Sequence, residues 1–404
     1  MSNALNIIIL PLARWDGPYS STALSLALEL SKRHKVFYID NPFTYKDILK
    51  KFNSKQIQKR RKAFFSKRNM YLKVENAPQN FTAVFVKPVL PINFLPSGKL
   101  YDYLLKVNDK VISTALKKII KDYQLESYVF INSYNPFYGL SFPKKYKPAL
   151  TVYHCVDNIE ESKYVAKHGK TLEIAAAKKA SIILTTSTAL TTKFEQLGCK
   201  VHFIPNAADI TLFSKSLSEV LPRPKELPEN KKIIGYFGNI CHRIDYDIIK
   251  ALAKSNPDKL ICLVGPVRKE AQIAGIAEIK NIILPGKKKL EELPAYLKYF
   301  DVCIIPFKKN KLTESIYPLK INEYLAGGKP VVSTNFSVDI SSFSPVIYLA
   351  NETGEFVLKV SRAMQENSAS KVEAGVKFSE NNSWAKRALQ VEKILINEMK
   401  EEIA

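Results

Sequence analysis

Short apolar runs alternate with amphipathic stretches along almost the whole chain. The first run covers residues 6–12, and a stretch with helical spacing follows at residues 21–32. Short apolar runs between turn residues are typical of strands buried on both faces, and helices between such strands are typical of a parallel sheet. The sequence therefore predicts an α/β protein whose parallel sheets are covered by helices on both faces.

The same alternation assigns the remaining elements in two halves. In the first half, strands are expected at residues 6–12, 35–39, 81–86, 128–132, 149–154, 182–185 and 201–204, and helices at 21–32, 100–122, 172–180 and 187–197. The second half opens at residue 233 with a strand, a glycine-bearing loop and a helix. Further strands are expected at 259–264, 281–284, 302–306, 331–333 and 346–348, and a last helix at 382–401.

A polar, proline-rich stretch at residues 214–230 separates the halves and is typical of a linker. A chain of 404 residues also favours more than one hydrophobic core. We expect a first domain over residues 1–213 and a second over 214–381. The last helix, within residues 382–404, is expected to return to the first domain.

The chain carries a formal net charge of +23, which implies an anionic partner. Residues 46–73 hold eleven lysines and arginines against one acid, with aromatic residues between them. This pattern predicts docking on an anionic membrane surface, since basic residues are attracted to anionic lipids. The alternative is a solvated, partly disordered loop. Nucleic acid is not expected as a partner, because no recognised nucleic-acid-binding motif accompanies the charge.

Neither a membrane span nor a zinc site is visible in the sequence. No apolar run reaches the about 18 residues that a spanning helix needs. Residues 6–12 lack a basic leader and a small-residue cleavage site, so we expect a cytoplasmic protein. The five cysteines are widely spaced and form no CxxC pair, which is typical of reduced thiols without a metal.

The most informative stretch is YPLKINEYLAGGKPVVST at residues 317–334. Pro318 suits the first turn of a helix, because it has no N–H to leave unsatisfied there. Gly327 and Gly328 suit the end of that helix, and an apolar strand follows. The stretch therefore predicts a helix at residues 318–326, a tight turn and a strand.

The start of this helix is a candidate binding site for a diphosphate. Free amides at a helix start attract phosphate oxygens, and Lys320 adds a full positive charge. Glu323 lies in the first two turns, where its carboxylate can accept both hydroxyls of a sugar. An ordinary connection between a helix and a strand, with Glu323 solvated, explains the same residues without a ligand.

This stretch resembles the donor-nucleotide signature of glycosyltransferases of the GT-B type, in particular the retaining group called family four and its teichuronic-acid-type relatives. The resemblance implies two Rossmann-like domains facing a central cleft, with Glu323 on the ribose and Pro318, Leu319 and Ile321 in the same donor site. The first glutamate of the Glu-x7-Glu pair would fall at Ser315, and this chain has Glu314 one residue earlier. The segment PNAAD at residues 205–209 resembles the turn that ends the first domain of these enzymes.

Two further loops of the second half are expected to bind the donor. Gly238 allows close approach of the backbone, Asn239 can donate a hydrogen bond, and Arg243 supplies a fork of donors. A generic loop with a surface arginine is the alternative. Gly286 and Lys287 lie in a second loop, of the kind that grips a uridine-type base. The family has a lysine close to the arginine; Asp245 stands there instead, so Lys320 is expected to be the second cation.

The acceptor is expected at strand ends of the first half, because open α/β sheets bind ligands at that edge. Asp157 is the candidate base or acceptor-orienting group, and His154 is the second candidate. A loop hydrogen bond or a helix cap explains either residue without catalysis, and a retaining enzyme would need no protein base. Gly17 is expected to lie near the transferred sugar, with Arg14, Trp15 and Asp16 beside it.

Together with these residues, the resemblance implies a glycosyltransferase that moves a sugar from a nucleotide-diphosphate donor, expected to be a UDP-sugar, without metal or cofactor. The expected acceptor is a saccharide, lipid-linked, in surface polysaccharide or cell-wall synthesis at the inner face of the membrane. A non-catalytic nucleotide-sugar-binding or membrane scaffold protein is one alternative. A sugar-nucleotide epimerase is another, but it would want a cluster of acids and histidines, and the five histidines are scattered.

Overall fold

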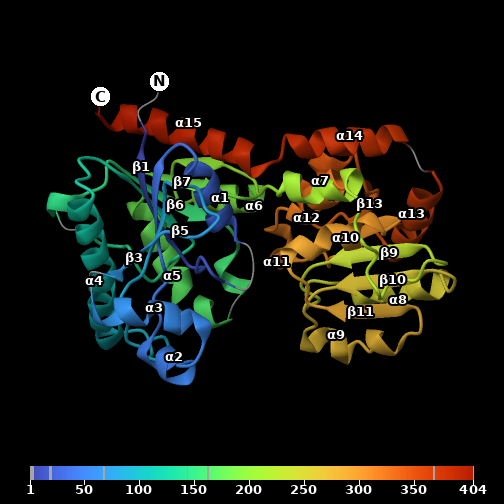
Figure 1. The fold of residues 1–404 in the computed structure, drawn as a ribbon, viewed down its shortest axis with the longest axis horizontal. Helices are drawn as coiled ribbons and strands as arrows, with labels where there is room; N and C mark the ends of the chain where they lie inside the picture. Colours follow the sequence, from blue (N-terminus) through green and yellow to red (C-terminus); the bar gives the residue numbers. More distant parts are fainter. Residues whose placement is uncertain are drawn as a thin grey trace. The chain divides into compact units, whose positions relative to one another are not determined.

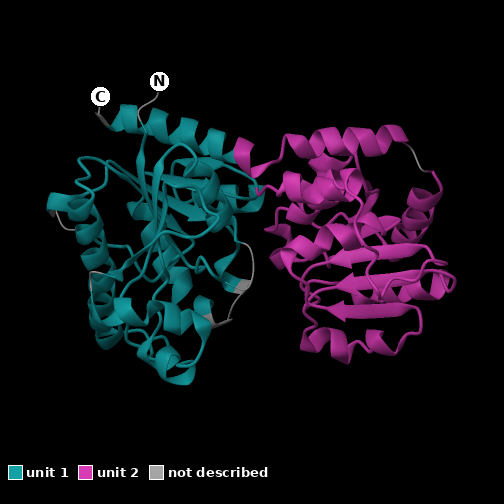
Figure 2. Cartoon of the chain, viewed as in Figure 1, with its two compact units in different colours: residues 1–205, 387–404 teal, residues 206–386 magenta. Residues whose placement is uncertain are grey.

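The computed structural model describes residues 4–17, 21–66, 69–142, 144–161, 163–366 and 369–403. The chain forms two compact units, residues 1–205 with 387–404 (unit 1) and residues 206–386 (unit 2) (Figure 2). Each unit is built around its own parallel sheet (Figure 1). No helix in the described ranges is long and apolar enough to cross a membrane.

Within the described residues, unit 1 holds an eight-stranded sheet in the order β3-β4-β2-β1-β5-β6-β7-β8. Its neighbouring strands pair in parallel except β3 with β4. The strands are β1 (Asn6–Pro11), β2 (Lys35–Ile39), β3 (Tyr71–Leu72), β4 (Phe81–Val84), β5 (Val129–Ser133), β6 (Leu150–Cys155), β7 (Ile182–Thr185) and β8 (Val201–Phe203).

The first strand shows why the apolar runs are continuous. Ile7 and Ile9 enter one core, whereas Ile8 and Leu10 enter another. Successive side chains of a strand point to opposite faces, so β1 is buried on both. Helices α1 (Thr22–Leu30) and α15 (Trp384–Ile403) supply the first core, and α4 (Lys99–Asp122) supplies the second. Helices α5 (Lys163–Lys179) and α6 (Thr188–Glu195) contribute to a third core.

The last helix is fixed to unit 1 by charged groups as well as by its apolar side. Glu398 pairs with Lys200 at 2.6 Å and with His202 at 3.0 Å. Glu392 pairs with Arg33 and lies 3.4 Å from His34. The last helix belongs to unit 1 from residue 387 onward.

The basic segment is helical, and the alternative of a disordered loop is wrong for its described residues. It forms α2 (Tyr45–Lys50) and α3 (Lys55–Phe65). Thr44 caps α2 reciprocally: its hydroxyl accepts from Asp47 N at 3.1 Å, and the Asp47 carboxylate accepts from Thr44 N at 3.0 Å. Residues 67 and 68 of the basic segment lie outside the described residues.

Unit 2 contains, in its described part, a six-stranded parallel sheet in the order β11-β10-β9-β12-β13-β14. The strands are β9 (Ile233–Phe237), β10 (Leu260–Val264), β11 (Ile282–Gly286), β12 (Val302–Ile305), β13 (Val331–Thr334) and β14 (Tyr348–Ala350). The helices are α7 (Ile210–Ser218), α8 (Tyr246–Ser255), α9 (Lys269–Ile273), α10 (Leu293–Lys298), α11 (Lys311–Glu314), α12 (Leu319–Ala326), α13 (Thr353–Gln365) and α14 (Ala369–Glu380).

The expected linker is partly helical. Asp209 caps α7 by accepting a hydrogen bond from Leu212 N at 3.0 Å, and Phe213 is fully buried in the core of unit 2. Residues 214–218 are therefore helix rather than linker. The units divide between residues 205 and 206, whereas the sequence placed the boundary between 213 and 214.

Candidate functional site

Two glycines meet at the carboxyl edge of the sheet in unit 2. Gly238 follows β9 with φ 147°, and Gly265 follows β10 with φ 150°. A methyl group added to Gly265 would lie 1.8 Å from the carbonyl oxygen of Gly238. Only glycine allows both this conformation and this approach of two backbones. The ends of β9 and β10 therefore lie backbone against backbone, with no side chain between them.

Lys320 from α12 lies across this backbone. A methyl group at Gly238 would be 2.2 Å from Lys320 Cε and 3.1 Å from its Nζ. Burial lowers the pKa of Lys320, the carboxylate of Glu323 opposes this effect, and the charge of Arg243 adds to it. The structure thus brings together Lys320, Gly238 and Arg243, three residues that the sequence assigned to the donor diphosphate.

Glu323 is the acid of this cluster. Burial raises its pKa to about 7, the charge of Lys320 opposes the rise, and Asp209 adds to it. The carboxyl group is therefore divided between its neutral and ionised forms near neutral pH. A ligand that donates hydrogen bonds to the carboxylate would favour the ionised form.

The position of α12 depends on a residue that sequence reasoning missed. The Tyr324 hydroxyl accepts a hydrogen bond from Phe237 N at 3.0 Å and lies 3.4 Å from Phe237 O. It therefore binds the backbone at the end of β9, one residue before Gly238. A tyrosine four residues after Lys320, on the same side of the helix, was the available signal.

The start of α12 is Leu319, and Pro318 is its N-cap without a side-chain hydrogen bond. Ile321 does not fit the expected donor contact: its side chain is fully buried in the core, and its N–H donates to Pro318 O at 3.1 Å. Leu319 N donates to Tyr317 O at 2.9 Å. Of the expected contacts on this helix, Lys320 and Glu323 are therefore the side chains that carry charge to the site.

The loops after β9 and β10 are hydrogen-bonded to each other. Ile240 N donates to Pro266 O at 3.0 Å, and Arg268 N donates to Ile240 O at 2.9 Å. The Arg268 side chain donates through Nε to Asn239 Oδ1 at 3.1 Å. The side chain of Asn239 is thus oriented by Arg268 through its oxygen atom, and this contact does not use the N–H groups of its amide nitrogen. Sequence reasoning missed Arg268 and Gly265, although a Gly-Pro pair after an apolar run was a visible signal.

The third loop at this edge follows β11. Gly286 has φ 78°, and its carbonyl accepts from Gly265 N at 2.9 Å. A methyl group at Gly286 would meet nothing within 4 Å, so there is space for a side chain. Glycine is favoured at this position because of its positive φ. Lys287 is exposed at the same strand end.

Ser315 stands where the first glutamate of the family pair would fall. It is buried, and its hydroxyl donates to Leu312 O at 2.8 Å. Glu314 is exposed at the end of α11. The carboxylate of Glu314 therefore comes one position before the place where the family has its first glutamate. The short hydroxyl side chain of Ser315 occupies that buried position.

In unit 1, His154 and Asp157 lie at the end of β6. Burial lowers the pKa of His154 to about 4, so its imidazole is neutral at neutral pH. Its Nδ1 lies 3.0 Å from the hydroxyl of Ser133 on the neighbouring β5. Asp157 is half-buried and accepts a hydrogen bond from Asn158 N at 2.9 Å. Of these two expected bases, Asp157 is the one that reaches solvent.

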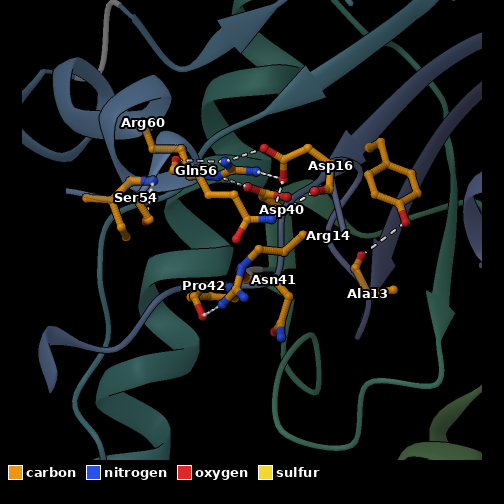
Figure 3. A network of polar contacts seen from close by, with 11 residues as sticks. Ala13, Arg14, Asp16, Asp40, Asn41, Pro42, Ser54, Gln56 and Arg60 are labelled. Carbon is orange, nitrogen blue, oxygen red and sulfur yellow. Dashed lines mark hydrogen bonds and ion pairs between the residues drawn. The ribbon is translucent and has the colours of Figure 1, made fainter. Parts of the chain in front are cut away.

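The first loop of unit 1 is held by a buried ion network (Figure 3). Arg60 from α3 donates to both carboxylate oxygens of Asp16, at 2.7 and 2.9 Å, and through Nε to Asp40. Arg60 is 1% exposed, so the expectation that it belongs to the basic surface is wrong. Burial raises the pKa of Asp40, and Arg60 opposes the rise.

The neighbours of this network are also engaged. Arg14 donates through Nε to Asn41 O at 3.0 Å, and its guanidinium lies 3.5 Å from the ring centre of Phe43. Gln56 Nε2 donates to Asp16 O at 2.8 Å. Arg14 and Asp16 therefore fix the shape of this loop over its described residues, up to Gly17.

No group of three or more histidines, cysteines or acids that could hold a metal ion occurs in the described part of the chain.

Part of the second unit is similar to a known protein family. Residues 231–366 match the family described as glycosyl transferases group 1. Over 152 residues the chain is 31% identical to a Bacillus subtilis (strain 168) protein named as the teichuronic acid biosynthesis glycosyltransferase TuaH. That alignment covers 37% of this chain and 38% of the relative, so it spans well under half of either protein.

Solved structures match over almost the whole chain. Sucrose-phosphate synthase from Thermosynechococcus elongatus matches with a TM-score of 0.70 and 14% identity, over 97% of this chain and 98% of the other. HepE from Anabaena, solved in complex with UDP and glucose, matches with a TM-score of 0.61 and 16% identity, over 97% and 99%. The chain therefore has the two-domain α/β fold of GT-B glycosyltransferases, and residues 231–366 match the glycosyl transferases group 1 family.

Proposed function

We propose that the protein is a glycosyltransferase and that unit 2 binds its nucleotide-diphosphate sugar donor. The observation that carries this proposal is the position of Lys320 across the backbone of Gly238, beside Arg243 and Glu323. The cluster lies within the residues that match the group 1 family and at the strand edge where open α/β sheets bind ligands.

The proposed diphosphate lies against Gly238 and the start of α12. Lys320 and Arg243 then neutralise the charge that grows on the diphosphate as the sugar leaves, without a metal ion. Asn239, oriented by Arg268, donates a further hydrogen bond. Burial lowers the pKa of Lys320 in the free protein, and repulsion from Arg243 adds to this effect. A bound diphosphate would relieve that repulsion.

The proposed ribose donates its hydroxyls to Glu323. The pKa of Glu323 is about 7, so part of the protein molecules carry a neutral Glu323 near neutral pH. Binding of the ribose to the ionised carboxylate would release a proton from those molecules. We propose uridine as the base, in contact with the loop at Gly286 and Lys287, since the structurally similar HepE was solved with UDP and glucose.

Unit 1 is proposed to bind the acceptor, a saccharide carried on a lipid in polysaccharide synthesis. The name of the Bacillus relative supports the pathway class. Asp157 is the proposed base or orienting group, because it reaches solvent at a strand end, whereas His154 is buried and neutral. The exposed cations of α2 and α3 are proposed to contact the anionic inner face of the membrane.

Calorimetric titration with nucleoside diphosphates and their sugars tests the donor proposal. UDP compounds should bind, and Glu323→Gln should weaken them by about tenfold or more, because a charged hydrogen-bond pair is lost. Glu314→Gln is the matched control, since Glu314 is an exposed acid nine residues earlier on the chain, at the end of α11. Equal binding by the two variants would remove the ribose assignment. Absence of binding by any nucleotide would favour the scaffold alternative.

A further inference from the structure

A pocket of about 270 Å³ lies in unit 1 beside α3 and α4. Its floor is apolar and is formed by Ala63, Met70, Phe85 and Ala115, each at most 5% exposed. These residues come from α3, from the segment before β3, from the chain just after β4, and from α4. None of the residues assigned above to the donor or the acceptor lines the pocket.

The side chains at its rim are positively charged. Lys87, Lys110 and Lys118 line the pocket, and no acid does so in the described part of the chain. Lys118 pairs with Asp122 at 2.6 Å, four residues further along α4. Lys87 and Lys110 have no ion pair with a described carboxylate. The rim therefore carries positive charge that the protein itself does not neutralise.

Apolar floor and cationic rim together define the chemistry of a ligand. An inorganic anion would pair with the lysines and leave the floor exposed to water. A neutral hydrocarbon would cover the floor and leave the lysines without a partner. A molecule with an alkyl chain and an anionic head satisfies both, because burial of methylene groups and charge pairing then act at one site.

The neighbouring surface favours a lipid as the source of this molecule. Ala63 of α3 enters the pocket, whereas Phe65, two residues further, is 83% exposed. Lys59, Arg61 and Lys62 of the same helix are exposed. An exposed aromatic ring among cations is typical of a helix that lies at a membrane interface.

We propose that this pocket holds one acyl chain of an anionic phospholipid, with its headgroup phosphate at Lys87 and Lys110. The choice of a membrane lipid rests on the membrane contact of the proposed function, whereas binding of an anionic amphiphile rests on the pocket alone. The bound chain would anchor α3 and α4 to the bilayer at one defined point, in addition to the diffuse attraction of the basic helices.

The ligand class is tested with soluble probes and the full chain. Dodecyl phosphate, below its micellar concentration, should bind more tightly than inorganic phosphate and than dodecyltrimethylammonium. Octyl phosphate should bind at least about tenfold more weakly than dodecyl phosphate, because fewer methylene groups are buried. Equal binding of the cationic and anionic amphiphiles would overturn the role of the lysines, and no effect of chain length would overturn the role of the floor.

Two variants locate the site. Thr114 lines the pocket but is exposed, so Thr114→Trp can fill it without disturbing the core. This variant and the double variant Lys87→Glu with Lys110→Glu should each weaken dodecyl phosphate by about tenfold. Lys250→Glu with Lys254→Glu, two exposed positions on α8 of unit 2, is the matched charge control for the double variant and should bind normally. Unchanged binding in both pocket variants would overturn the proposal.

Phospholipid vesicles then test the lipid source. Thr114→Trp should weaken binding to vesicles that contain phosphatidylglycerol, while Lys250→Glu with Lys254→Glu should not. Normal vesicle binding by a Thr114→Trp protein that no longer binds dodecyl phosphate would overturn the membrane lipid as the occupant. Nucleotide binding, measured in parallel, should be unchanged in all variants. A failure of the pocket is therefore distinguishable from a failure of the proposed donor site.

Discussion

Replacement of Arg60 by methionine should destabilise unit 1 strongly, although the residue lies within a basic surface segment. The Arg60 side chain is 2% exposed, and its partners Asp16 and Asp40 are 12% and 3% exposed. Removal of one member of a buried ion network leaves the others without compensation and costs about 3 to 5 kcal/mol. Asp40 is the worst affected, because its Oδ1 has no hydrogen-bond partner even with Arg60 in place.

The pH dependence of this loss gives a second signature. Burial already raises the pKa of Asp40, and loss of Arg60 would raise it further. The carboxyl group of the variant can then take up a proton, which removes the uncompensated charge. We therefore expect the difference in unfolding free energy between wild type and Arg60→Met to shrink as the pH falls from 7 toward 5.

Urea unfolding followed by tryptophan fluorescence measures the effect in the right unit. The chain has two tryptophans, Trp15 in unit 1 and Trp384 in unit 2. In a Trp384→Phe background, Trp15 alone reports, and its ring lies 6.0 Å from the Arg60 guanidinium carbon. Arg61→Met is the matched control, since Arg61 is the next residue of α3 and is exposed. It should change the free energy by at most about 0.5 kcal/mol. Equal losses in the two variants would refute the buried-network argument.

Three further predictions concern other parts of the molecule. Because Glu323 has a pKa of about 7 in the free protein, UDP affinity should fall about fivefold from pH 7 to pH 6 through this group, and Glu323→Gln should lack that component in calorimetry; identical pH profiles would contradict it. The folded-state pKa of His154, about 4, lies below its unfolded value, so stability is lost as the pH falls through the window from about 6.5 to 4. Between pH 7 and pH 5, His154→Asn should lose about 2 kcal/mol less unfolding free energy than the wild type, as measured by urea unfolding. An unchanged pH dependence in this variant would contradict the prediction. Replacement of Lys55, Lys59, Arg61 and Lys62 by glutamine should weaken binding to anionic vesicles by up to about 10³-fold, at about 1 kcal/mol per charge, in a sedimentation assay. The exposed lysines of unit 2, Lys250, Lys254, Lys269 and Lys280, provide a control with the same change of charge, and equal loss in both sets would reduce the effect to net charge.

The strands could be predicted from the sequence because both sheets are covered on two faces. In β1 and β9 every residue is buried or nearly so, which leaves continuous apolar runs. Helices α2 and α3 were missed for a related reason. The buried positions of α3 include Ile57, Arg60 and Phe64, which have helical spacing, but the middle one is an arginine. From the sequence alone, an arginine that pairs with two buried acids cannot be told apart from an arginine on the solvent-exposed surface.

The candidate site could be predicted only in part. Lys320 and Glu323 belong to one short motif, and Gly238 belongs to a glycine-bearing loop. The structure brings the motif and the loop together. The spacing of Tyr324 from Lys320 places both residues on one side of the helix, but the sequence does not show the partner of Tyr324, which is a backbone group of a distant strand. The neutral state of His154 depends on burial by the whole unit, which no local pattern reports.

A crystal structure of the protein with bound UDP would test the central claim most directly. The proposed donor site predicts the ribose hydroxyls on the Glu323 carboxylate and the diphosphate between Lys320, Arg243 and the backbone of Gly238. Density for the nucleotide at any other place, with Glu323 facing solvent, would contradict the account.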